Sequence, residues 1–166
     1  MRGERQLRTK VAHEPPAPHM EGRKPLEARR PALVMRHVHE NKLALCVALE
    51  AVADALPESV CRAECLRIAS LLVPLLREAH AYEDDVIFPA YAAAAPDADL
   101  TIQRLRVEHV EDESFADEVT EILLAVGHGE PIANAEAMGF MLRGLFETLR
   151  RHIAFEREHV LPAILG

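Results

Sequence analysis

The 166-residue chain is long enough for one domain with a sizeable apolar core. Hydrophobic residues make up 49% of it and aromatic residues only 4%, so Leu, Ala and Val must form most of the core, which favours helix over strand. Residues 1–30 hold eight Lys/Arg and four Asp/Glu, which leaves eleven and twenty-three, a net charge of −12, for the remainder and argues against nucleic acid as a partner.

Two features of the chain bear on its location in the cell. No apolar run approaches the roughly 20 residues of a membrane helix, and no apolar stretch of a secretory signal follows the positively charged N-terminus. The three cysteines form no CxxC pair, which argues against a disulfide framework or zinc knuckle and predicts buried free thiols. We therefore expect a cytoplasmic protein without membrane contact.

Residues 1–30 differ in composition from the rest of the chain. They are rich in Arg, Lys and Pro and have almost no apolar periodicity, so they cannot bury enough surface to offset the entropy lost on ordering. The sequence predicts a disordered basic tail over 1–30 and a folded domain over 31–166.

Apolar residues at helical spacing predict the first two helices. The first runs from Pro31 to Pro57, and its apolar stripe, extended towards the helix start, reaches His39. This stripe consists of Leu43, Cys46, Leu49, Val52 and Leu56. The second helix is expected to be capped by Ser59 and to end at Pro89. Its final turns contain His80, Glu83 and Asp84.

Two further helices follow the same pattern. The third is predicted from Asp99 or Thr101 to Gly127, and its inner stripe includes His109 and Asp112.

The fourth helix begins after the capping residue Asn134 and ends at Pro162, with His152 and Glu156 on its inner stripe. Four amphipathic helices joined by short loops, without a strand signal, predict an all-α, up-down-up-down antiparallel four-helix bundle.

Histidines and carboxylates are expected to meet at one level of this bundle. His39 and His109 each lie eight residues after the predicted start of their helix. Glu83 and Glu156 each lie six residues before the proline predicted to end theirs. With a rise of about 1.5 Å per residue, all four lie within a turn or two of a common depth. Burying so many polar groups is costly unless they are paired, and a metal ion is the natural partner.

The ligand types narrow the choice of metal. Six or seven imidazole and carboxylate groups exceed what one tetrahedral zinc ion uses, and they suit a carboxylate-bridged pair of iron or manganese ions. At this point the chain resembles a known family. The motif His152-Ile153-Ala154-Phe155-Glu156 followed by Val160-Leu161-Pro162 is similar to the closing motif of the hemerythrin-like (HHE cation-binding) domains. Similar to the family's other motifs are His39, His80 with Glu83-Asp84 and Ile87-Phe88-Pro89, and Glu108-His109.

The resemblance covers residues 31–165 and implies a four-helix bundle with a non-haem di-iron centre, in preference to a single metal, manganese or zinc. It implies that the terminal ligands are His39, His80, His109 and His152, and that Glu156 is a bridging carboxylate. The carboxylate ligand of the second helix stays open. The count from Pro89 favours Glu83, whereas the position four residues after His80 is Asp84.

The third helix departs from the oxygen carriers of this family. Where they have a second histidine, four residues after the first, this chain has Glu113. A carboxylate is a harder, anionic ligand that favours ferric iron and could fill the position where oxygen binds. This departure argues against reversible oxygen carriage.

We therefore expect a di-iron protein that binds or senses oxygen, nitric oxide, peroxide or iron. One alternative is a di-iron oxidase or peroxidase-like enzyme, although no substrate pocket and no catalytic residue can be recognised in the sequence. Another is a metal-free structural bundle, which could form a homodimer through the apolar residues 92–95.

Overall fold

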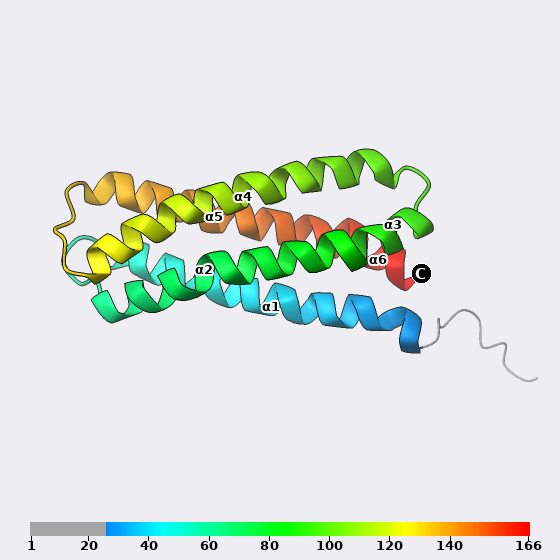
Figure 1. Ribbon diagram of the computed structural model, residues 1–166, viewed down its shortest axis with the longest axis horizontal. Helices are drawn as coiled ribbons and strands as arrows, with labels where there is room; N and C mark the ends of the chain where they lie inside the picture. Colours follow the sequence, from blue (N-terminus) through cyan, green and yellow to red (C-terminus); the bar gives the residue numbers. More distant parts are fainter. Residues whose placement is uncertain (1–25) are drawn as a thin grey trace, which may run out of the picture.

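The structure is a computed structural model and describes residues 26–166. Four long helices form most of it. They are α1 (Leu26–Asp54), α2 (Arg62–Tyr82), α4 (Ala98–Gly127) and α5 (Ala135–Phe155). Successive long helices run in opposite directions, with α2 mainly against α4 and α1 mainly against α5 (Figure 1). The described residues contain no strand, so the predicted all-α antiparallel bundle is confirmed. Most of the tail that was predicted to be disordered, residues 1–25, lies outside the described range. Its last residues, 26–30, belong to α1.

The helices that carry the second and fourth motifs do not end at their prolines, as the sequence had suggested. Helix α2 continues through a π-helical turn, η1 (Glu83–Ile87), into α3 (Phe88–Ala94). Helix α5 continues in the same way through η2 (Glu156–Val160) into α6 (Leu161–Leu165). Each proline is the second residue of the short helix that follows, directly after the π-helical turn. The predicted helix ends at Pro89 and Pro162 are therefore wrong.

Other helix ends agree in part with the sequence pattern. Helix α1 begins before Pro31, which lies inside it at the cost of one intrahelical hydrogen bond. The predicted cap at Ser59 is wrong, because α2 begins after Cys61, whose side chain makes no capping bond. The predicted cap at Asn134 is confirmed, since its Oδ1 accepts a hydrogen bond from the Ala137 N–H at 2.9 Å.

Buried apolar residues form two separate clusters inside the bundle. The larger fills the half nearer the α1–α2 and α4–α5 connections and includes Leu49, Leu72, Leu123 and Leu145. The smaller, which we call the lid cluster, packs the two short helices against the starts of α1 and α4 and includes Met35, Phe88, Leu105 and Leu161. The space between the two clusters is where the predicted ligand layer falls.

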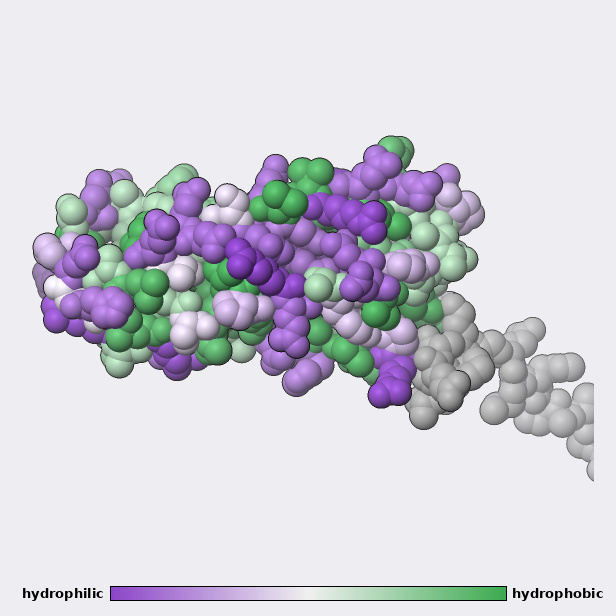
Figure 2. Space-filling view, viewed as in Figure 1, coloured by the Kyte–Doolittle hydropathy of each residue, from purple (hydrophilic) through white to green (hydrophobic). Residues whose placement is uncertain are grey.

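The outer surface of the bundle is mixed in character. Hydrophilic residues cover most of the face shown in Figure 2, with hydrophobic residues scattered among them. Within residues 26–166, no helix combines the length and the apolar character that a membrane span requires. All three cysteines are free thiols, but only Cys46 and Cys65 are buried, so the prediction is wrong for the exposed Cys61.

Candidate metal centre

A layer of polar side chains separates the two apolar clusters. Among residues 30–166, the buried polar or charged residues are His39, Lys42, His80, Glu83, His109, Asp112, His152 and Glu156. They come from all four long helices and from the first residue of each π-helical turn. A π-helical turn within an α-helix often marks a functional site, and both turns here begin at a buried glutamate.

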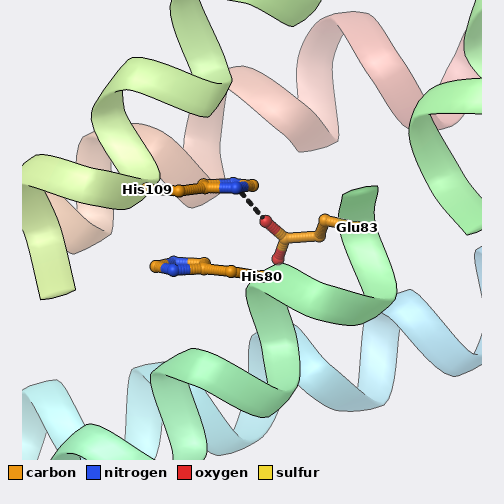
Figure 3. A group of neighbouring side chains, drawn as sticks. All are labelled: His80, Glu83 and His109. Carbon is orange, nitrogen blue, oxygen red and sulfur yellow. Dashed lines mark ion pairs between the residues drawn. The ribbon is translucent and has the colours of Figure 1, made fainter. Parts of the chain in front are cut away.

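Two groups of potential ligand atoms share the carboxylate of Glu83. His80, Glu83 and His109 form the first group, in which the atoms that could bind an ion lie within 4.8 Å of one another. The rings of His80 and His109 stack with centroids 4.0 Å apart, and the Glu83 carboxylate points towards His109 (Figure 3). Glu83, His152 and Glu156 form the second group under the same distance limit.

The atoms that converge in these groups lack hydrogen-bond partners. The His109 Nε2 and Glu83 Oε2 atoms lie 2.8 Å apart, yet neither makes a hydrogen bond. His152 Nε2 lies 3.7 Å from Glu83 Oε2 and 3.6 Å from Glu156 Oε1, again without a hydrogen bond. His80 Nε2 completes the five atoms of the two groups that lack a hydrogen-bond partner. A buried polar atom without a partner costs about 1–3 kcal/mol, and a cation held by either group would satisfy the atoms of that group.

Carboxylates outside the layer orient two of these histidines. Glu113 Oε1 accepts a hydrogen bond from His80 Nδ1 at 2.9 Å, and Glu108 Oε2 accepts one from His152 Nδ1 at 3.0 Å. Because a carboxylate only accepts, each Nδ1 carries the proton and each Nε2 presents its lone pair to the layer when the ring is neutral. Metal-binding histidines in proteins are commonly held by such carboxylates.

Comparison with known families matches residues 30–164 to the hemerythrin HHE cation-binding domain. The chain belongs to this family. No curated protein and no solved structure matches it. The family makes this a cation-binding protein, and the buried His and Glu side chains are groups that could hold the cation in this HHE domain.

Six of the eight predicted ligands lie in the buried layer of the HHE domain, namely His39, His80, Glu83, His109, His152 and Glu156. Asp84 lies outside it, with a side chain that is 39% exposed and paired with Arg106. Glu113 also lies outside, where it contacts the outer nitrogen of His80 and the guanidinium of Arg77. The geometry therefore favours Glu83 over Asp84 as a ligand and gives Glu113 an orienting contact, while coordination by any of these residues stays a prediction.

His39 is engaged differently from the other three histidines. Its Nδ1 accepts a hydrogen bond from Arg157 Nε at 3.4 Å, so its proton lies on Nε2. That Nε2 donates to Glu156 Oε2 at 2.8 Å. Both ring nitrogens of His39 thus have partners within the chain.

Sequence reasoning missed Lys42, which is fully buried and donates from its Nζ to Glu83 Oε1 at 3.1 Å. A signal was present, because Lys42 lies three residues after His39 and four before Cys46 and so shares their helix face. Leu43, which the predicted stripe included, is only partly buried. The residue type argued against a buried position, because lysine is almost never fully buried unless it is paired.

Asp112 was placed correctly on the inner stripe of α4 but not recognised as part of the site. Its side chain is buried and its Oδ2 has no hydrogen-bond partner. Burial raises its pKa, against the opposing effects of His152 and Lys42. Asp112 therefore adds a third buried carboxyl group to the layer.

The charges of the layer shift its titrating groups in opposite directions. Burial alone would lower the pKa of Lys42, but Glu83 and Glu156 outweigh it and raise that pKa. Burial likewise works against protonation of His152, yet Glu156 and Glu83 raise its pKa to about 9. Burial and the Lys42 ammonium lower the pKa of His80 to about 2. Without a metal, Lys42 and His152 are thus protonated at neutral pH and His80 is neutral.

Proposed function

We propose that this HHE domain binds iron in its buried layer and uses it to bind or sense oxygen, nitric oxide or peroxide. The observation that supports this most directly is the set of five buried, unpartnered ligand atoms, three imidazole nitrogens and two carboxylate oxygens. Five mixed donors exceed the four of a structural zinc site and suit iron, with manganese as the nearest competitor.

The residues that would hold the ion are His80, His109 and His152 through Nε2, with Glu83 and Glu156 through one oxygen each. When bound, iron supplies a redox-active centre whose open coordination positions can take a small ligand. The chain itself supplies orientation, since Glu113 and Glu108 fix two of the rings. Because apolar clusters close the layer on both sides, only small molecules would reach the bound ion.

The test is the iron content of protein purified from iron-replete cells and of metal-free protein reloaded anaerobically with ferrous iron. We expect His109→Ala to lose most of the bound iron. A matched control is His37→Ala on α1, because the side chain of His37 is 74% exposed. Wild-type protein that folds equally well without metal and takes up no iron would contradict the proposal.

Ligand binding needs its own measurement. Addition of nitric oxide to the anaerobic ferrous protein should change its visible spectrum and its electron paramagnetic resonance (EPR) signal. Ferrous protein whose spectra respond to neither nitric oxide, oxygen nor peroxide would contradict the sensing part of the proposal but not iron binding.

A further inference from the structure

The two buried glutamates of the layer each divide their oxygens between two kinds of partner. Glu83 Oε2 and Glu156 Oε1 face the unpartnered histidine nitrogens. Their other oxygens are already bonded, Glu83 Oε1 by Lys42 Nζ at 3.1 Å and Glu156 Oε2 by His39 Nε2 at 2.8 Å. A carboxylate that bridges two metal ions through both of its oxygens gives one to each, and here the second oxygen of both glutamates is already bonded within the chain.

We propose that the layer holds one metal ion and that the ammonium group of Lys42 takes the place of a second. This inference rests on the proposed function, in which the layer binds iron, and it replaces the two-ion centre expected from sequence. The single ion would lie among the nitrogens of His80, His109 and His152. Lys42 and His39 occupy the opposite side of the two carboxylates.

The charges of the layer agree with a single divalent ion. Three buried carboxyl groups, Glu83, Glu156 and Asp112, face one buried ammonium, that of Lys42. When all three are ionised, two negative charges remain, which one divalent cation neutralises. A second divalent ion would leave positive charge in a desolvated layer and would need further anions from solvent to balance it.

The position of Lys42 makes its ammonium hard to displace. The residue is 0% exposed, and its charge interacts with Glu156 and Asp112 in addition to its hydrogen bond to Glu83. Both ring nitrogens of His39 are also in use. Its Nε2 donates a proton to Glu156, which binding an ion would remove, and its Nδ1 accepts a hydrogen bond from Arg157. Room for a second ion would therefore require two buried contacts to break.

The experiment counts iron per chain after anaerobic loading of the full chain with ferrous iron, by elemental analysis against protein concentration. We expect one iron per wild-type chain and, after oxidation, the EPR signal of an isolated high-spin ferric ion. Two irons with the silent spectrum of a coupled ferric pair would overturn this inference but leave the proposed function standing. No bound iron would overturn both.

A substitution tests the role of Lys42 directly. Lys42→Ala removes the ammonium and opens space beside Glu83 Oε1, so we expect the iron count to rise from one towards two. Lys42→Arg keeps the charge and should stay at one. A folded Lys42→Ala protein that still binds one iron would overturn the assignment of Lys42 to the second position. If that variant does not fold, the wild-type count and EPR signal still decide the number of ions.

Discussion

The two sides of the buried layer use the same two glutamates in different ways. On one side, which we call the open side, their oxygens meet the Nε2 atoms of His80, His109 and His152, and none of these atoms has a hydrogen-bond partner. On the other, the paired side, Lys42 and His39 donate to the remaining oxygens at 3.1 Å and 2.8 Å. The difference indicates that only part of a histidine- and carboxylate-rich layer needs a cation from solution, because the chain itself neutralises the rest.

The largest expected effect comes from Glu83, which serves both sides. Glu83→Ala removes a ligand atom from the open side and leaves the Lys42 ammonium buried without its closest partner. We expect loss of iron binding and a fall of about 3–5 kcal/mol in the free energy of unfolding, as when one partner of a buried ion pair is removed. Iron analysis and urea unfolding measure the two effects.

The neighbouring residue provides a matched control for that substitution. Asp84→Ala removes a carboxylate that pairs with Arg106 at 3.1 Å and lies 3.8 Å from the outer nitrogen of His109, beyond hydrogen-bond distance. Its cost should be about 0–1 kcal/mol, and most of the iron should stay bound. Equal losses in the two variants would mean that Glu83 has no special place in the layer.

A pH dependence follows from the protonation of His152 on the open side. In metal-free protein the pKa of His152 is about 9, against 6.5 as its ordinary value, because Glu156 and Glu83 outweigh burial. The stability that this protonation contributes is fully present below pH 6.5 and is lost as the pH rises through 9, by up to about 3 kcal/mol. Urea unfolding of metal-free wild type and His152→Gln across this range should show the loss only in wild type.

Orientation of a ring on the open side should have a smaller but measurable effect on metal affinity. Glu113→Ala removes the acceptor that fixes His80 Nδ1, and we expect iron affinity to fall about 10–100-fold. Asp117→Ala is the control, because Asp117 contacts the same Arg77 but no histidine. An unchanged affinity in Glu113→Ala would show that His80 does not depend on this contact.

The smallest effect is expected on the paired side. Arg157→Gln weakens the hydrogen bond to His39 Nδ1, which should cost about 0.5–1.5 kcal/mol of stability while iron affinity stays within a few-fold of wild type. Titration with ferrous iron distinguishes this result from that of Glu113→Ala. A loss of affinity as large as in the Glu113 variant would mean that His39 binds the metal, and the two sides would then be equivalent.

The helices and the depth of the layer could be predicted because apolar periodicity and residue counting depend only on helix geometry. Counting back from Pro89 and Pro162 reached Glu83 and Glu156, which the structure buries. The count worked for a reason the sequence did not reveal, since each proline follows a π-helical turn and does not end its helix. The positions of the two prolines therefore located the buried glutamates correctly, although the prolines do not end their helices.

The partners inside the layer could not be predicted in the same way. Lys42 lies on the inner face of α1, but a lysine is expected outside unless its partner is known, and Glu83 lies on another helix. Glu113 follows Asp112 directly and points about 100° away from it around the helix, so the orientation of α4 against its neighbours decides which of the two faces inward. The structure buries Asp112 and turns Glu113 to the back of His80. Such choices depend on packing between helices, which no local pattern contains.

The two π-helical turns have a consequence for how the lid cluster packs. In each, the first amide of the short helix that follows bonds to the carbonyl of the glutamate five residues earlier, from Phe88 to Glu83 and from Leu161 to Glu156. Each turn thus holds one residue more than an α-helical pattern, so the residues on its two sides follow separate apolar registers. The lid residues of α3 and α6 therefore pack in a register of their own, offset from that of α2 and α5. Met35 and Leu105 of the same cluster stay in the registers of α1 and α4, which carry His39 and His109, so the lid still supports two of the histidines directly.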